Sequence, residues 1–253
     1  MKEVLLSAKG LCKQFPNGTG MEQVLKNIDV DIYTGDFTVI MGSSGAGKST
    51  LLYALSGMDG ITGGKVLYKG EEISGYNERK MAGLRSREFG FVFQQTHLVS
   101  SLSLFENVAV AGCLDSGKNT KAVRQEAEEL LKQMRVEKAK DRYPSEVSGG
   151  EAQRAAIARA VINHPGLIFA DEPTGALNKR NSEEVMKLLT DINGNGQSIL
   201  MVTHDIRAAI RGTRILYLED GRILDEMVFP VFLEEDAKNR EKKLSDWLGA
   251  LSW

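Results

Sequence analysis

Three short runs of this 253-residue chain are almost entirely apolar, and they predict its central sheet. They are Phe37 to Met41, Leu167 to Ala170 and Ser198 to Val202. A strand without polar alternation is buried on both faces, which is typical of a parallel sheet with helices on each side. Phe89 to Phe93 has the same character and ends on Gln94-Gln95. The pattern therefore predicts an α/β fold with a mixed, mainly parallel sheet.

Alternating apolar and polar positions predict antiparallel strands elsewhere in the chain. Residues 3–35 indicate antiparallel β-structure with a turn at Pro16-Asn17-Gly18, and a further short strand is expected at Lys65 to Tyr68. Towards the C-terminus, residues 214–225 predict a hairpin that turns at Asp220-Gly221.

Helical periodicity is clearest in the middle of the chain and at its end. Residues 104–142 are expected to be helical, with one apolar face formed by Val123, Ala127, Leu130, Leu131 and Met134. A polar helix is expected at Asn77 to Arg87. In the tail, residues 231–253, one helical face is formed by Leu244, Trp247, Leu248 and Leu251. We expect this tail to dock on its own domain; a contact with a partner subunit or second copy is the alternative.

A glycine-rich segment between the first apolar run and a helical segment has the pattern of a phosphate-binding loop, G-x-x-x-x-G-K-[ST]. Its residues are Gly42, Ser43, Ser44, Gly45, Ala46, Gly47, Lys48, Ser49 and Thr50. Glycines allow successive backbone N–H groups to face one anion, and the helix N-terminus adds about half a positive charge. Lys48 can reach the β- and γ-phosphates of a nucleotide, and the Ser49 hydroxyl is placed to bind Mg²⁺.

Polar side chains follow two of the other apolar runs. Asp171-Glu172 comes directly after Ala170, and His204 comes shortly after Val202. Ligands of an open α/β sheet bind at the carboxyl ends of its strands. We therefore expect Asp171 to hold Mg²⁺ and Glu172 to orient or deprotonate the water that attacks the γ-phosphate. His204 is expected to contact that phosphate.

A second anion-binding helix N-terminus is predicted at Ser148, Gly149, Gly150 and Glu151. Ser148 and Glu151 have the spacing of a capping box, which marks a helix start with exposed N–H groups and a hydroxyl. It is not obvious how both helix ends of one domain could grip the same nucleotide. A symmetric dimer resolves this, because each copy's Ser148 helix would close on the ATP of the other copy.

Composition limits the partners and the location that we expect. The net charge is −2 and there is no dense block of Lys and Arg, so the sequence shows no basic patch of the kind that binds nucleic acid. Two cysteines force no disulfide framework and suit a reducing compartment. The N-terminal apolar run is too short for a signal peptide, and no run approaches the roughly 18 apolar residues of a transmembrane helix. We therefore expect a cytoplasmic protein that reaches the inner face of the membrane only through another chain.

Together these motifs resemble the ATP-binding subunit of an ABC transporter over about residues 3–228. In that family, residues 42–50 correspond to Walker A, Ser148 to Glu151 to the signature motif, Asp171-Glu172 to Walker B and His204 to the switch histidine. The amino-acid sequence of residues 143–150 and 170–177 resembles one branch of the family in particular. That branch contains macrolide and antimicrobial-peptide exporters, lipoprotein-release ATPases and their cell-division relative.

The resemblance implies roles for two further residues. Phe15 would stack on adenine, and Gln94 would be the Q-loop glutamine, which contacts Mg²⁺ and senses the transmembrane partner. It also implies that Glu172 is the catalytic glutamate, with Lys48 and His204 supplying charge in the reaction.

Three positions depart from the commonest form of the family. Glu151 stands where the signature usually has Gln, and Asn178 stands where the loop after Walker B usually ends in Asp. Phe15 replaces a commoner Tyr. None of these changes removes a catalytic group; the Asn178 change bears on communication between the two active sites.

The resemblance implies a P-loop NTPase core with helices on both faces, an antiparallel β-subdomain and an α-helical signature subdomain near residues 96–160. These form an ATPase domain of residues 1–228, and a helical tail of residues 229–253 follows. A homodimer would hydrolyse Mg-ATP to drive a separate transmembrane permease, with export or extraction of peptide, lipid or drug-like substrates.

Three alternatives stay open. A cell-division or signalling ATPase of the same branch would drive a membrane partner without transport. A DNA-repair or chromosome ATPase would carry long coiled-coil or zinc insertions, which this spacing of motifs does not accommodate. A cluster-assembly ATPase would have soluble partners.

Overall fold

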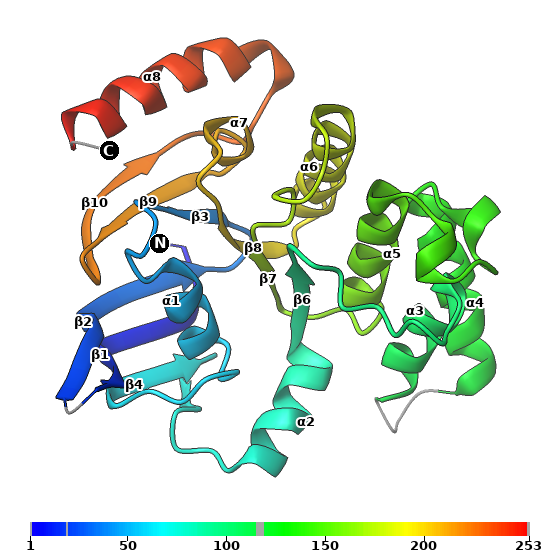
Figure 1. The fold of residues 1–253 in the computed structure, drawn as a ribbon, viewed down its shortest axis with the longest axis horizontal. Coiled ribbons are helices and arrows are strands. Elements are labelled where there is room, and N and C mark those ends of the chain that lie inside the picture. Colours follow the sequence, from blue (N-terminus) through cyan, green and yellow to red (C-terminus); the bar gives the residue numbers. More distant parts are fainter. Residues whose placement is uncertain (1, 19, 115–118, 252–253) are drawn as a thin grey trace. The chain divides into compact units, whose positions relative to one another are not determined.

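The computed structural model describes residues 2–18, 20–114 and 119–251, and the chain divides into two compact units (Figure 1). Unit 1 takes in both ends of the chain, up to Met81 and from Ile192 onward, and unit 2 is the intervening segment Ala82–Asp191. Of the helices that the structure describes, none is both long and apolar enough to cross a membrane.

Unit 1 contains an antiparallel sheet with the strand order β2-β1-β4-β5. Its strands are β1 (Val4–Asn17), β2 (Gly20–Tyr33), β4 (Gly63–Tyr68) and β5 (Glu71–Glu72). Burial alternates along the second half of β2, where Ile28, Val30 and Ile32 are buried, whereas β1 buries Leu5 to Ala8 without alternation. The antiparallel structure predicted for residues 3–35 is confirmed, but Pro16 and Asn17, which were expected in the turn, belong to β1 and pair with Met21 and Gly20.

The second group of strands in unit 1 is built around the apolar run that precedes the glycine-rich loop. Strand β3 (Phe37–Met41) lies between β8 (Ser198–Val202) and β9 (Arg214–Glu219) and is parallel to both. Strand β10 (Arg222–Val228) pairs antiparallel with β9. Every residue of β3 and β8 is buried, as the absence of polar alternation predicts. Helices α1 (Lys48–Leu55) and α7 (Ile206–Ala209) follow β3 and β8 in the chain.

The C-terminal tail is part of unit 1. It contains a short 3-10 helix, η3 (Glu234–Asp236), and α8 (Ala237–Ala250), which Figure 1 draws in red beside β9 and β10. Leu244 and Leu248 are fully buried, and the indole N–H of Trp247 donates to Asp225 of β10. The expectation of a tail helix docked on its own domain is confirmed for the described residues; residues 252 and 253 lie outside them.

A buried arginine, Arg240, fastens this tail. Only 2% of Arg240 is exposed, and its guanidinium donates to four backbone carbonyls, those of Ile210, Gly212, Pro230 and Val231. It also lies over the rings of Phe229 and Phe232. Burial lowers the pKa of Arg240, but an arginine stays charged in proteins, so these carbonyls hold a cation. Four charge-assisted hydrogen bonds and two aromatic contacts offset the cost of burying that charge.

Unit 2 combines two parallel strands with helices. Strand β6 (Phe89–Phe93) pairs with β7 (Leu167–Asp171) in parallel. The helices between β4 and β8 in the chain are α2 (Glu78–Glu88), α3 (Leu104–Cys113), α4 (Thr120–Gln133), η1 (Glu137–Ala139), η2 (Pro144–Glu146), α5 (Gly149–Val161) and α6 (Lys179–Gly194). Helix α3 packs against α4 and α5. Parallel strands and covering helices in one chain confirm the α/β prediction.

The expectation that residues 104–142 form helix throughout is wrong. Helix α3 ends at Cys113, and α4 starts anew at Thr120, because the Asn119 side chain accepts a hydrogen bond from the N–H of Lys121 and caps it. Arg135 has a φ of 57°, and a residue in this left-handed conformation ends a helix. The predicted apolar face of α4 is present, with Val123, Ala127 and Leu131 fully buried. Residues 115–118 lie outside the described part of the chain.

Candidate functional site

The glycine-rich loop of unit 1 connects β3 to α1 and is shaped by close backbone contacts. A Cβ at Gly42 would lie 1.9 Å from the carbonyl oxygen of Leu218 in β9, so this position has no room for a side chain. Gly47, with a φ of 99°, is the N-cap residue of α1. Helix α1 has no side-chain cap and no acidic residue in its first turn. No carboxylate of the same helix therefore competes with an external anion for its first N–H groups.

Lys48 begins α1 and is 92% buried, since its exposed fraction is 8%. Its Nζ donates to the carbonyl oxygens of Gly42 and Ser43, at 3.0 and 2.7 Å. The ammonium group is thus held over the loop in front of the helix N-terminus. The half-buried Ser49 and Thr50 follow it in the first turn. The loop brings a fixed cation, a hydroxyl and a helix N-terminus together, which is the arrangement that the sequence predicted.

An acid that the motif does not contain also contacts this loop. The Glu219 carboxylate, at the end of β9, accepts hydrogen bonds from the Ser43 hydroxyl at 2.7 Å and from the Ser43 N–H at 3.2 Å. The hydrogen bond from the Ser43 side chain is the main reason that the pKa of Glu219 lies below its ordinary range. The adjoining turn helps as well, because the Gly221 N–H donates to the Ala46 carbonyl. The β9–β10 hairpin therefore braces the loop from outside the motif.

Two other predicted residues lie in unit 1. His204 is exposed just beyond β8, and the N–H of the preceding residue, Thr203, donates to Ile40 of β3. His204 and the glycine-rich loop thus follow the same ends of two adjacent parallel strands, as predicted. Phe15 lies on β1, where 38% of it is exposed and the Lys13 ammonium is 4.7 Å from its ring centroid.

Unit 2 brings Gln94 and the two acids Asp171 and Glu172 to one end of its strand pair. Phe93 of β6 is paired in register with Asp171 of β7, so the exposed Gln94 and the half-buried Glu172 each follow that pair. A Cβ at Gly175 would lie 2.9 Å from Nε2 of Gln94. The loop after β7 therefore passes directly against the Gln94 side chain, which links the two strand ends.

Glu172 has an unusual backbone. Its φ of 45° is in the left-handed region, which a residue with a β-carbon adopts at a cost of roughly 1–3 kcal/mol. Its carbonyl accepts a hydrogen bond from the Gly175 N–H, which closes a tight turn immediately after β7. Strained conformations of this kind concentrate where a side chain must be held in one direction. The sequence motif identifies Glu172 but gives no sign of this turn.

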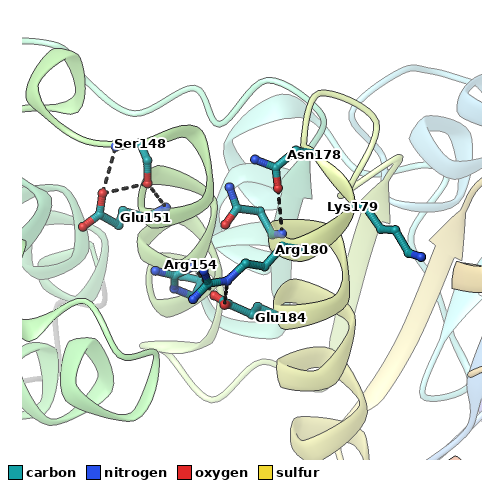
Figure 2. A pocket seen from close by; sticks show the side chains of 8 residues that line it. Ser148, Glu151, Arg154, Asn178, Lys179, Arg180 and Glu184 are labelled. Atoms are coloured by element: carbon teal, nitrogen blue, oxygen red, sulfur yellow. Dashed lines mark hydrogen bonds and ion pairs between the residues drawn. The ribbon is translucent and has the colours of Figure 1, made fainter.

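The predicted second helix N-terminus is present at α5 of unit 2, and Figure 2 shows its hydrogen bonds. The Ser148 Oγ accepts from the Glu151 N–H at 3.3 Å. One carboxylate oxygen of Glu151 accepts from both the Ser148 N–H, at 2.9 Å, and the Ser148 hydroxyl, at 2.7 Å. Ser148 and Gly149 are exposed. The capping box expected from the sequence is confirmed.

These residues line a pocket of about 620 Å³ between the N-terminal parts of α5 and α6 (Figure 2). Its lining residues are Ser148, Glu151, Arg154, Asn178, Lys179, Arg180, Asn181 and Glu184. Arg154 of α5 donates to Glu184 of α6 at 2.9 Å. A Cβ at Gly150 would lie 2.5 Å from the Asn181 side chain, so the two helices approach closely here and a larger residue would displace that side chain.

Asn178, the position that departs from the family, caps α6. Its Oδ1 accepts from the Asn181 N–H at 3.0 Å, and its carbonyl accepts from the Ser182 N–H. Asn and Asp are nearly equivalent in that position, because either side chain offers an oxygen to the same N–H. The departure therefore leaves the local structure of the helix start unchanged and alters only its charge.

The predicted magnesium ligands are all oxygen donors. They are the Ser49 hydroxyl in unit 1 and, in unit 2, the Gln94 amide and the Asp171 carboxylate. Proteins usually bind Mg²⁺ through one or two such oxygens together with the phosphates of a substrate. Gln94 and Asp171 come from adjacent strand ends of unit 2, so these two oxygen donors fit a magnesium ion that binds together with a nucleotide.

Comparison with known proteins gives a consistent result. Residues 25–175 match the family model described as ABC transporter. Two dimeric structures of the protein MJ0796 are similar over 90% of this chain and all of theirs, each with a TM-score of 0.83. One is a post-hydrolysis state of the ATP-binding cassette with ADP and phosphate, at 35% identity, and the other is described as a bacterial ABC transporter cassette, at 36%.

A third solved structure extends the similarity. It is cbiO1 from Clostridium perfringens, described as part of the ABC transporter complex cbiONQ. Its sequence is 27% identical, its TM-score is 0.80, and the match covers 96% of this chain and 93% of that one.

Proposed function

This chain belongs to the ABC transporter family as an ATP-binding cassette with ATPase activity, and from that premise we propose that it drives a separate membrane permease by hydrolysing Mg-ATP in a head-to-tail homodimer. The observation that supports this most is the construction of α1. Its N-terminus follows a glycine-rich loop, has no side-chain cap and lies beside the buried ammonium of Lys48. A phosphate is the ligand that such an uncapped helix end binds best.

The residues of each unit have complementary roles in this proposal. Lys48 and the N–H groups of residues 42–50 bind the phosphates, and Phe15 stacks on the base. Ser49, Gln94 and Asp171 hold Mg²⁺, which when bound neutralises charge on the phosphates. Glu172 orients or deprotonates the attacking water, and His204 contacts the γ-phosphate. Fixed charges of this kind are the main source of catalysis in phosphoryl transfer.

The dimer completes the site. Ser148, Gly149, Gly150 and Glu151 form the N-terminus of α5, where Ser148 and Gly149 are exposed, and we propose that it meets the terminal phosphate bound by the other copy. The two MJ0796 structures are dimers, and the cassette in one of them carries ADP and phosphate. An isologous arrangement gives two equivalent sites, so each copy both holds one ATP and closes the other.

The test is the Glu172→Gln variant, which keeps the size of the side chain and removes the charge that the reaction requires. We expect this variant to form a stable dimer with Mg-ATP, measured by size-exclusion chromatography with light scattering. Adding Lys48→Ala to the same chain should leave it monomeric, because the phosphates lose their main cation. A Glu172→Gln chain that binds ATP but stays monomeric at every ATP concentration would contradict the proposed dimer.

We further propose that the partner is an exporter or extractor of peptide, lipid or drug-like substrates, and that the cassette reaches the inner face of the membrane through it. The support is the resemblance of residues 143–150 and 170–177 to that branch. Purification from membranes should recover a permease whose substrate stimulates the ATPase. A membrane partner that stimulates the ATPase without moving any substrate would instead indicate a cell-division or signalling role.

A further inference from the structure

The hydrogen bonds of Ser148 leave little for a phosphate. Its hydroxyl has one proton, and that proton is donated to Glu151 at 2.7 Å. Its backbone N–H is donated to the same carboxylate oxygen at 2.9 Å. The donors by which this residue would grip an anion are therefore both engaged by an anion of the same helix.

The negative charge of Glu151 strengthens its hold on the two Ser148 donors. The hydrogen bond from the Ser148 side chain, followed by that from its backbone, lowers the pKa of Glu151, so the group is ionised at neutral pH. A carboxylate in the first turn is also stabilised by the helix dipole. A phosphate that approached Ser148 would meet a negative charge in the place it has to occupy.

We propose that Glu151 is a positioning residue that competes with the terminal phosphate of the partner copy's ATP for Ser148, and so sets the ATP concentration at which the dimer closes. This inference rests on the proposed function, since it concerns the second helix N-terminus of the same composite site. Closure then requires the Glu151 carboxylate to release the Ser148 hydroxyl.

The structure provides a place for the released carboxylate. Arg154 lies one helical turn further along α5 and lines the same pocket (Figure 2). It is 91% buried, with an exposed fraction of 9%, and within the described part of the chain its Nε has no hydrogen-bond partner. One other nitrogen of Arg154 holds Glu184. Residues three apart on a helix can pair, so Glu151 can exchange Ser148 for Arg154.

A matched capping box elsewhere in unit 2 separates competition from helix capping. Ser103 and Glu106 at the start of α3 make the same reciprocal hydrogen bonds, at 3.2 and 2.8 Å. The pKa of Glu106 is likewise lowered, through its hydrogen bonds with Ser103. Glu106→Gln therefore reproduces the loss of a capping carboxylate at a helix that the proposed ATP site does not use.

The experiment compares three variants. The parent carries Glu172→Gln alone, and the other two carry Glu172→Gln together with either Glu151→Gln or Glu106→Gln. Dimer formation is followed by light scattering as Mg-ATP is added. Glutamine still fits a capping box, so the helix start is kept while the charge is lost. We expect Glu151→Gln to lower the ATP concentration at half-dimerisation about tenfold, or about 1.4 kcal/mol. This advantage should shrink with added salt, and Glu106→Gln should match its parent.

Each outcome decides the matter. If Glu151→Gln dimerises at the same or a higher ATP concentration than its parent, or if Glu106→Gln gains equally, competition by Glu151 is refuted while the dimer stands. If all three chains bind ATP and none dimerises, the proposed function fails and the inference fails with it. A parent that dimerises poorly and a Glu151→Gln chain that dimerises readily would support both.

Discussion

The N-termini of α1 and α5 are both proposed to face phosphate, yet they are built differently. Helix α1 starts at a glycine in a left-handed conformation and has no side-chain cap and no acid in its first turn. Helix α5 starts at a serine whose hydroxyl and N–H are held by Glu151. The acid next to α1, Glu219, contacts Ser43 at the beginning of the loop instead. An uncapped end has its N–H groups free of side-chain competition and suits direct phosphate binding, whereas a capped end suits the contact with the other copy that we propose forms and breaks in each cycle.

The largest expected effect concerns the loop before α1. Gly42→Ala places a methyl group against the Leu218 carbonyl, where a Cβ would lie at 1.9 Å. We expect a loss of about 3 kcal/mol or more in the free energy of unfolding and the loss of ATP binding. Gly45→Ala is the control, because its φ is 86° but no atom lies within 4 Å of the added Cβ. It should cost only about 1 kcal/mol. Thermal unfolding and calorimetric titration with ATP measure both; equal losses would refute the steric explanation.

An intermediate effect is expected at α5. Ser148→Ala removes the side-chain cap and should cost about 1 kcal/mol of stability, the same as Ser103→Ala at α3. In the Glu172→Gln background, Ser148→Ala should weaken ATP-dependent dimerisation and Ser103→Ala should not, because only the Ser148 hydroxyl is proposed to bind the partner's phosphate once Glu151 releases it. If both variants dimerise like their parent, Ser148 is only a helix cap, and the contrast between α1 and α5 loses its functional meaning.

The smallest effect is expected at Glu219, and it depends on pH. The folded state lowers the pKa of this carboxyl below its ordinary value of 4.5, so its contribution to stability is present above that value and disappears as the pH falls through the lowered one. Glu219→Gln should therefore cost about 0.5 kcal/mol at pH 7 and nothing at the acid end of the curve. Thermal unfolding of both proteins between neutral and acid pH checks this. A difference that does not change with pH would mean that packing, not charge, holds the loop.

The features that the sequence predicted correctly are those with a local or periodic cause. Apolar runs gave the buried strands, and the Ser148–Glu151 spacing gave the capping box because both partners lie on one helix turn. The contacts that were missed join residues far apart in the chain, such as Ser43 with Glu219 and Arg240 with four carbonyls. Nothing in the neighbourhood of Glu219 marks it, apart from its place at a hairpin turn.

Two further features could not be predicted for reasons of backbone geometry. The left-handed φ of Glu172 depends on the turn after β7, and no residue preference announces it. The break after α3 was missed because apolar periodicity continues on either side of it, while the Asn119 cap is a single residue. Patterns averaged over many residues therefore located the elements better than they located the ends.

The discontinuity of unit 1 has a consequence for how the protein is made. Strand β3 is synthesised before unit 2, but its partners β8 and β9, and Arg240 with its four carbonyl contacts, are synthesised after unit 2. Unit 2 is synthesised in between and is complete while β3 still lacks both neighbours. The nucleotide loop therefore acquires its shape only after the whole of unit 2 has been synthesised, so the nascent chain gains the ability to bind ATP later than it can fold the intervening unit.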